Sequence, residues 1–152
     1  MRIVDFLQAE DIVPEMRGTE KLSALAELAE SMARRHGVDA KAALGVLLDR
    51  EKLASTGIGD GVAIPHGKLA GAPGLCAALA RSRPGVPFDS VDGRAAHLFF
   101  ALIAPESSTG LHLKALARIS RLVKDAGFRH RLLEASDAAQ MYRMLLEEDG
   151  KL

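Results

Sequence analysis

Two apolar segments in the middle of the chain constrain its fold more than any other feature. Leu75–Ala80 and Ala95–Ala104 are hydrophobic along most of their length, and neither shows the clean alternation of a strand with one face in water. Segments of this kind are typical of strands that are covered on both faces. They predict a sheet that needs a layer of helices on each side.

Helical periodicity before and after these strands supplies the two layers. Apolar residues recur at helical spacing in five expected helices: between Thr19 and Gly37, after Asp39 up to about Leu53, after Pro105 up to about Val123, over 128–134, and after Ser136. Thr19, Asp39 and Ser136 are the expected N-terminal caps, and Gly37 follows the end of the first helix. The order of helices, strands and helices predicts an α/β fold with one sheet flanked by helices on both faces.

The length and composition predict a single domain over residues 1–152. A chain of 152 residues with 48% hydrophobic residues can bury a core without a disulfide or a structural metal. Tryptophan is absent and there is one tyrosine, so Leu, Ala, Ile and Val must build that core. The single cysteine, Cys76, lies in an apolar segment, where we expect a buried, reduced thiol. No pattern indicates a cofactor.

The charge balance and the N-terminus argue against several classes of function. Lys plus Arg and Asp plus Glu both number 20, so the chain lacks the basic excess typical of nucleic-acid-binding domains. Asp5, Glu10 and Asp11 interrupt the N-terminus where a signal peptide needs apolar residues. The longest apolar run, Leu98–Ala104, is too short to cross a membrane. We expect a cytoplasmic protein that neither binds nucleic acid nor inserts into a membrane.

The segment after the second expected helix carries an unusual concentration of glycines, at positions 57, 59, 61 and 67. No helix tolerates that density, so a structured loop with a short strand is expected. Glycine permits positive φ angles and lets backbone N–H groups converge on an anion. Three cations flank the segment, namely Arg50, Lys52 and Lys68. The pattern predicts a cradle for a phosphoryl group, with these phosphate-binding residues: Ser55, Thr56, Gly57 and Gly59.

The glycine-rich motifs that bind nucleotides do not fit this segment. A Walker loop requires G-x-x-x-x-G-K-[ST], but five residues separate Gly61 from Gly67, and Leu69 follows Lys68. The dinucleotide fingerprint fails because Val62 occupies the position of its third glycine. No nucleotide-binding fold is indicated, which leaves a histidine in the segment as the candidate phosphoryl acceptor.

Two histidines are candidates for phosphoryl chemistry. Neutral imidazole is a good nucleophile near pH 7, and the group bound by one ring nitrogen fixes which nitrogen is free to react. A histidine such as His66, which follows Pro65, is by itself more often a loop residue bonded to backbone, but the clustered glycines, hydroxyls and Arg50 favour the acceptor role. His112 follows Gly110 at the start of a helix, where amides favour an anion. By spacing alone, a buried core histidine is its better interpretation.

The remaining histidines carry no functional signal. His36 lies at a helix C-terminus, His97 opens a strand, and His130 lies on a charged helical face. No pair has the spacing of a metal site such as H-E-x-x-H, and one cysteine cannot build a thiolate site. A zinc site on His66 and His112 would need further ligands that the sequence does not offer. We expect no structural metal.

The segment STGIGDGVAIPHGK (Ser55–Lys68) resembles the phosphorylation site of fructose/mannitol-type enzyme IIA domains of the bacterial phosphoenolpyruvate-dependent phosphotransferase system. Among these domains, the chain is most similar to the stand-alone nitrogen-regulatory IIA proteins. The resemblance continues through PFDSVDGRAAHLFFALIAPE (Pro87–Glu106) and HLKALARIS (His112–Ser120). It implies one EIIA type-2 domain over residues 1–152, with a mixed sheet flanked by helices.

The resemblance also implies an activity and partners. An HPr-like phosphocarrier would phosphorylate His66 at Nε2, with assistance from His112 and Arg50, and the phosphoprotein would act in nitrogen-related regulation. Asp60 stands where the family commonly has Asn, so either its carboxylate points outward or the transfer is tuned by repulsion. Two alternatives stay open: a sugar-specific IIA subunit that passes phosphate to a IIB domain during uptake, and a non-catalytic anion-binding regulatory module.

Overall fold

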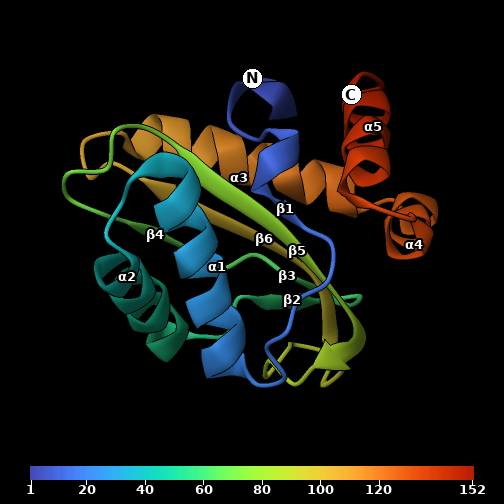
Figure 1. The fold of residues 1–152 in the computed structure, drawn as a ribbon, viewed down its shortest axis with the longest axis horizontal. Helices are drawn as coiled ribbons and strands as arrows, with labels where there is room; N and C mark the ends of the chain where they lie inside the picture. Colours follow the sequence, from blue (N-terminus) through green and yellow to red (C-terminus); the bar gives the residue numbers. More distant parts are fainter.

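A mixed six-stranded sheet forms the centre of the computed structural model, which describes residues 1–152 (Figure 1). The strands are β1 (Ile12–Val13), β2 (Gly57–Gly59), β3 (Val62–Ala63), β4 (His66–Lys68), β5 (Cys76–Val86) and β6 (Ala96–Ala104). Their order is β1-β5-β6-β3-β2, and β4 pairs with β6 further along that strand than β3 does. The β5–β6 and β2–β3 pairs are antiparallel, and the other pairs are parallel.

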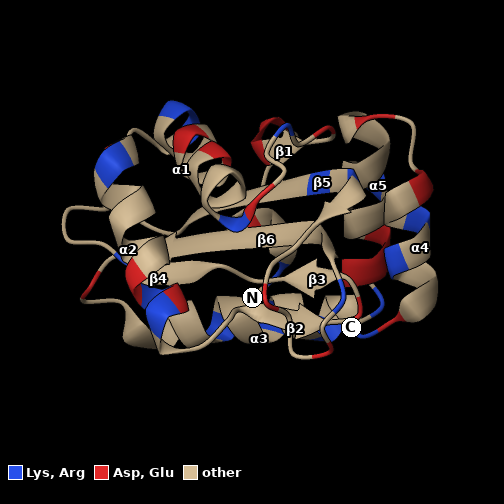
Figure 2. Cartoon of the chain, turned by 90° about the horizontal axis from the view of Figure 1, so that it is seen from below, with Lys and Arg blue, Asp and Glu red and all other residues tan.

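Helices cover both faces of this sheet, which confirms the predicted fold class. They are α1 (Lys21–His36), α2 (Ala40–Leu53), α3 (Thr109–Val123), α4 (Ala126–Glu134) and α5 (Ala138–Asp149), with 3-10 turns η1 (Ile3–Asp5) and η2 (Ala9–Asp11) near the N-terminus. In the view of Figure 2, α1 lies on one side of the strands and α3 on the other. Two buried cores result, one beneath α1 and α2 and one beneath α3, α4 and α5.

The central strands divide their side chains between these two cores. Along β6, successive residues alternate between the core beneath α3 and the core beneath α1, in the order Leu98, Phe99, Phe100, Ala101, Leu102, Ile103. Neighbouring side chains of a strand point to opposite faces, so two covered faces require apolar residues at every position. Charged residues lie mainly on helices and loops, and β6 carries none (Figure 2).

Two helix starts differ from the sequence-based prediction. Helix α1 begins after Glu20, one residue later than a Thr19 cap would place it. Helix α5 is capped by Asp137, whose side chain accepts a hydrogen bond from the Gln140 amide, and Ser136 lies outside the cap. Ser and Asp are similar as caps, so the sequence does not decide between Ser136 and Asp137. At α1 the Glu20 amide donates to the Ser23 hydroxyl at 3.1 Å, which fixes the later start.

Strand β5 is longer than predicted. The apolar segment predicted as a strand ends at Ala80, but β5 continues to Val86 and includes Pro84. The register of β5 against β6 shifts between Arg81 and Val86, so the ladder needs no N–H at the proline. Gly85, with a φ of 88°, completes this irregularity and lets the His97 ring approach the backbone.

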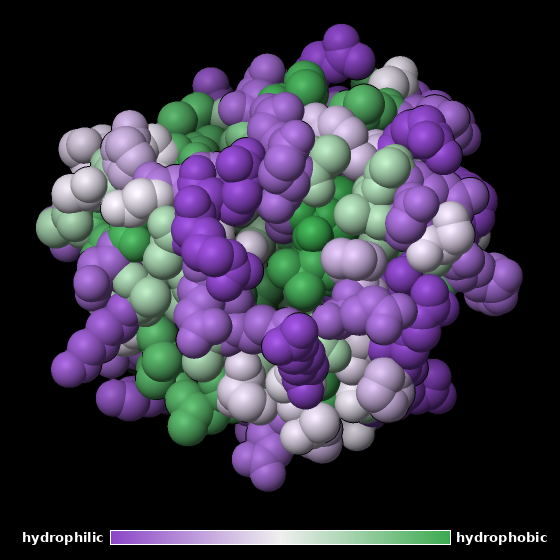
Figure 3. Space-filling view, in the orientation of Figure 1, coloured by the Kyte–Doolittle hydropathy of each residue, from purple (hydrophilic) through white to green (hydrophobic).

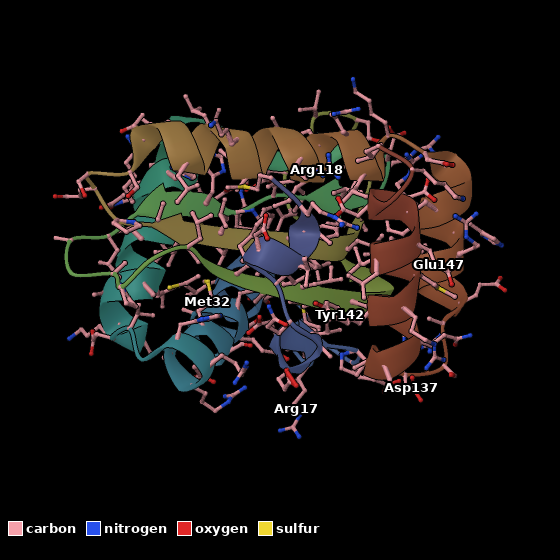
Figure 4. All side chains as sticks on the ribbon, turned by 90° about the horizontal axis from the view of Figure 1, so that it is seen from above. Arg17, Met32, Arg118, Asp137, Tyr142 and Glu147 are labelled. Carbon is pink, nitrogen blue, oxygen red and sulfur yellow. The ribbon has the colours of Figure 1, made fainter.

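Polar contacts attach the N-terminal segment and the C-terminal helices to the sheet. Arg81 of β5 is fully buried and donates hydrogen bonds to the Leu132 and Ala135 carbonyls at the end of α4. Tyr142 of α5 donates to the Leu7 carbonyl, and its side chain is directed from α5 toward the N-terminal segment (Figure 4). These hydrogen bonds hold together segments that are distant in the sequence.

The outer surface is mixed in character. Positive and negative residues lie side by side on the helices (Figure 2), in agreement with the net charge of zero. The face shown in Figure 3 is largely hydrophilic, with small hydrophobic areas between the polar side chains. No helix has the length and apolar content needed to cross a membrane.

Candidate active site

A cleft of about 610 Å³ lies between α2, β4 and α3. Helix α2 contributes Arg50, β4 contributes His66 and Lys68, and α3 contributes Thr109 and His112. Three segments that are far apart in the sequence therefore bring together the two histidines and the arginine that the sequence analysis selected. The two leading predicted site residues, His66 and His112, have their ring centroids 5.6 Å apart, with the rings edge to face at 67°.

The sheet and a glycine place His66 in this cleft. β4 pairs in parallel with β6, with His66 opposite Leu102, and the Leu102 amide donates to the Pro65 carbonyl at 2.9 Å. The next residue, Gly67, faces α2, and a Cβ there would lie 3.1 Å from Val46 Cγ2. Glycine at this position lets the helix pack closely on the strand, so Gly67 serves packing and not a positive φ angle.

The ring of His66 is held in one tautomer. Its Nδ1 lies 2.8 Å from the Ile64 carbonyl oxygen. A carbonyl only accepts hydrogen bonds, so Nδ1 carries the proton and the lone pair is on Nε2. The side chain is half-buried, and Nε2 is the atom available for a bond to phosphorus.

His112 is buried beside His66 and lacks a partner at one ring nitrogen. The residue is 5% exposed, and its Nε2 has no hydrogen-bond partner within the chain. Burial, with smaller contributions from His66 and Lys68, lowers the pKa of His112 to about 4. His112 is therefore neutral near pH 7. A buried nitrogen without a partner beside a candidate acceptor suits a bond to a ligand oxygen.

Two cations and a helix start complete the cleft. Arg50 Nη1 donates to the Ala54 carbonyl at 2.9 Å, which leaves other guanidinium donors available. Lys68 Nζ donates to the Thr109 hydroxyl at 2.8 Å, and Thr109 is the first residue of α3. The first amides of a helix have no partner within it and favour an anion. These donors suit a small anion at His66, although two carboxylates, those of Asp49 and Glu106, also line the cleft.

The four residues predicted to bind phosphate do not line this cleft. The Ser55 hydroxyl donates to the Phe88 carbonyl at 2.7 Å, and the Thr56 hydroxyl is bonded to the Glu51 carboxylate. A Cβ at Gly57 would lie 2.4 Å from Ser90 Oγ, and Gly59 has a φ of 95° beside Asp92. These residues hold β2 against the connection between β5 and β6. A phosphate-binding role for them finds no support in this arrangement.

Asp60 lies outside the cleft that holds His66 and His112. Its φ is 56°, a left-handed conformation in which Asn and Asp are the best tolerated residues after glycine. Its amide donates to Asp92 Oδ2 at 3.0 Å, and its exposed side chain borders a different hollow, together with Gly61 and Arg94. Of the two alternatives for Asp60, the structure therefore has the carboxylate outside the cleft, and the substitution for Asn is explained by the backbone conformation.

Several residues of the site were not singled out by the sequence. Leu53 and Leu113, which are 81% and 61% exposed, form an apolar rim around the cleft. Glu51, with a side chain 6% exposed, accepts hydrogen bonds from Thr56. Its position next to Arg50 was the only available signal.

The other histidines lie outside the cleft. His36 Nε2 is 3.0 Å from Asp11 Oδ1, and His130 pairs with Glu134 on the surface. His97 donates through Nδ1 to the Ser82 carbonyl. No group of three or more His, Cys, Asp and Glu side chains is arranged to hold a metal ion.

Comparison with known families identifies the class of protein. Residues 5–148 match the family described as "Phosphoenolpyruvate-dependent sugar phosphotransferase system, EIIA 2". The match covers nearly the whole chain and includes both histidines of the cleft. The chain belongs to this family, which confirms the resemblance found in the sequence.

Individual relatives and a solved structure show which members of the family the chain is similar to. The chain is 42% identical to the "Nitrogen regulatory protein" of Bradyrhizobium diazoefficiens over 145 residues, which cover 95% of each chain. It is 34% identical over 150 residues to the fructose-specific EIIABC component of Bacillus subtilis, covering 98% of this chain and 24% of that protein. The crystal structure of nitrogen regulatory protein IIA-Ntr from Neisseria meningitidis matches with a TM-score of 0.88 and 34% identity, over 94% of this chain and 98% of that one.

Proposed function

We propose that the chain is a phosphoryl carrier of the phosphotransferase system and that His66 Nε2 accepts the phosphoryl group. The donor is the phosphohistidine of an HPr-like phosphocarrier. Its P–N bond breaks as a new P–N bond forms at Nε2, so the group passes from one imidazole to another. The observation that carries the proposal is the pair of imidazoles in one cleft, with His66 Nδ1 bonded to the Ile64 carbonyl and Nε2 free. The protein then acts as a phosphotransferase with a phosphohistidine intermediate.

His112 supports this transfer as a neutral donor. The transition state of phosphoryl transfer spreads negative charge over the equatorial oxygens, so positioned donors and charges provide most of the catalysis. His112 Nε2 is buried, has no partner and faces no competing acceptor within the chain. Since its pKa is about 4, it stays neutral near pH 7 and offers one N–H to a phosphoryl oxygen.

Arg50 and Lys68 supply positive charge at the same cleft. The Arg50 guanidinium is always charged and presents a planar set of donors that fits two oxygens of a phosphoryl group. Lys68 is held by Thr109 at the start of α3, near the first amides of that helix. Together they place two positive charges beside a phosphoryl group on His66, in a cleft that Asp49 and Glu106 also line.

The output of this carrier is regulatory. A phosphoryl group adds roughly −1.5 to −2 charges at His66. That charge would appear next to the exposed leucines of the rim, Leu53 and Leu113, and would change which partners this surface can bind. The relatives named nitrogen regulatory protein, which match over nearly their full length, support this output.

A sugar-specific role is the second candidate. The chain also aligns with a 24% portion of a fructose-specific EIIABC component, so the same site could pass phosphate to a IIB domain during uptake. The two candidates share the chemistry at His66 and differ in the recipient. Incubation of the phosphoprotein with fructose- or mannitol-type IIB domains separates them, because only the sugar-specific role predicts rapid loss of the phosphoryl group to IIB.

Phosphorylation itself is tested with enzyme I, phosphoenolpyruvate and an HPr-like carrier. We expect the intact mass to rise by one phosphoryl group, in an acid-labile and base-stable linkage that maps to His66. A chain that binds inorganic phosphate but gains no covalent phosphate would instead be an anion-binding regulatory module, and the proposal would be wrong.

A further inference from the structure

Glu51 forms a buried network at the end of α2, immediately after Arg50. Both of its carboxylate oxygens accept the Thr56 amide, at 3.2 and 3.0 Å, and one of them is also bonded to the Thr56 hydroxyl. Lys21, the first residue of α1, lies 2.8 Å from the same carboxylate. The Glu51 side chain is only 6% exposed, so this carboxylate is held from three directions in a site that is poorly accessible to water.

The network replaces the usual termination of a helix. Many helices end with a residue in the left-handed conformation, usually glycine, whose amide donates a hydrogen bond back to the last turn. α2 ends at Leu53, and the next residue, Ala54, is fully extended with a φ of −172° and makes no such bond. Side chains take over instead: Arg50 donates to the Ala54 carbonyl, and Glu51 binds Thr56. Two neighbouring residues therefore fix the same turn.

The same network is tied to the connection between β5 and β6. Lys21 Nζ lies 4.8 Å from the centroid of the Phe88 ring, and the Ser55 hydroxyl donates to the Phe88 carbonyl. The turn that carries Arg50 is thus anchored to two other elements. Because Arg50 has a long side chain with several rotatable bonds, its place in the cleft depends on how firmly its turn is held.

We propose that Glu51 is a positioning residue for phosphoryl transfer: through Thr56 and Lys21 it fixes the turn from which Arg50 enters the cleft. This inference rests on the proposed function. It gives Thr56 a part in the reaction that differs from the predicted one, because its hydroxyl binds a carboxylate that orders Arg50 instead of binding phosphate. Glu51 does not touch the reacting atoms.

The test compares Glu51→Gln with Glu27→Gln. Glu27 is a matched control, because its carboxylate also accepts backbone amides, those of Arg17 and Gly18, but at a different hollow that shares no residue with the cleft. The first measurement is ¹⁵N relaxation of the Arg50 Nε–H group in the unphosphorylated protein. We expect Glu51→Gln and Thr56→Val to lower its order parameter, and Glu27→Gln to leave it at the wild-type value.

The second measurement is single-turnover transfer from the phosphorylated carrier. We expect Glu51→Gln to slow transfer about 5-fold, as for one weakened hydrogen bond, and Glu27→Gln to transfer at the wild-type rate. In an Arg50→Met background, Glu51→Gln should cause no further slowing, whereas a merely structural role would slow both backgrounds equally.

Each outcome bears on one proposal. An unchanged Arg50 signal in Glu51→Gln, or a rate loss of equal size with Arg50→Met, would overturn the positioning role. The relaxation measurement is made on the unphosphorylated protein, so it tests the positioning role independently of phosphorylation. If the wild-type chain accepts no phosphoryl group, that result contradicts the proposed function and leaves the relaxation test of Glu51 valid.

Discussion

His66 on β4 lies beside the C-terminal end of β6, and His97 lies near the N-terminal end of β6. Both histidines have a fixed ring tautomer, but only His66 has the surroundings of a reactive residue. Both rings direct Nδ1 at a main-chain carbonyl, at 2.8 Å from Ile64 O and 3.0 Å from Ser82 O. Both therefore present Nε2 as the free nitrogen. The histidine nearest to His66 across its cleft is His112, which is buried and lacks a partner at Nε2.

His97 has no buried histidine without a hydrogen-bond partner beside it. The other histidine that borders its hollow, His130, is exposed and paired with Glu134 at 3.2 Å. The His97 ring is packed against the backbone of Gly85, where a Cβ would lie 2.8 Å from Cε1. A fixed tautomer is thus common to both ends of the strand. What distinguishes the candidate active site is a second, buried imidazole whose Nε2 has no partner within the chain.

The largest expected effect is on phosphorylation, which should be lost in a variant of His66 and kept in a variant of His97. We expect His66→Ala to abolish phosphorylation and His97→Ala to accept one phosphoryl group, because only the first variant loses the nucleophile. Intact-mass spectrometry after incubation with phosphoenolpyruvate, enzyme I and the carrier measures both. Circular dichroism of the two variants controls for folding. Phosphate on His66→Ala would remove the distinction between the two ends of β6.

The second effect tests whether the buried donor matters. His112→Ala should still accept phosphate, but about 10²-fold more slowly, as for the loss of one preorganised donor. His112→Gln keeps an N–H donor and should recover part of the rate. Single-turnover transfer from the phosphorylated carrier measures these rates. Wild-type speed in His112→Ala would make His112 an ordinary core histidine.

The third effect concerns acid stability. Folding lowers the pKa of His112 from 6.5 to about 4, so between these values the unfolded chain binds a proton that the folded chain does not. Stability is therefore lost as the pH falls, by about 2 kcal/mol from this residue between pH 7 and pH 5. His112→Gln should lose that much less than wild type over the same interval. Urea unfolding at the two pH values measures the difference, and identical losses would contradict the lowered pKa.

The fourth effect tests the shape of the Arg50 side chain. Arg50→Lys keeps the charge but loses the planar pair of donors, so transfer should slow by roughly 10-fold if one charge-assisted hydrogen bond is weakened. The assay is again single-turnover transfer. A wild-type rate would leave Arg50 with its contact to the Ala54 carbonyl as its only role.

The smallest effect is expected at Asp60. Since its side chain lies outside the cleft, Asp60→Asn should transfer phosphate within about 2-fold of the wild-type rate. Asp60→Ala should instead lower the free energy of unfolding by roughly 1 kcal/mol, because alanine tolerates a φ of 56° poorly. A large rate gain in Asp60→Asn would mean that the carboxylate acts on the phosphoryl group.

The local sequence pattern was sufficient to predict the layers of the fold, but it did not predict the contacts of the glycine-rich segment. The apolar run of β6 predicted a strand covered on both faces, because alternation along a strand is a property of neighbouring residues. Ser55, Thr56 and the first two glycines were predicted as phosphate ligands because their types suit an anion. Two of their actual partners, Phe88 and Ser90, lie in the distant connection between β5 and β6, and no local rule predicts such contacts.

The sequence by itself determined the α/β layering and the place of His66 in an IPH motif among glycines, because both depend on residues close together along the chain. Only the tertiary structure decided that the rings of His66 and His112 lie 5.6 Å apart. It also decided that His112 is buried with a pKa of about 4. Burial and proximity between β4 and α3 depend on how the helices pack on the sheet, and that packing sets both the missing hydrogen-bond partner and the neutral state of His112.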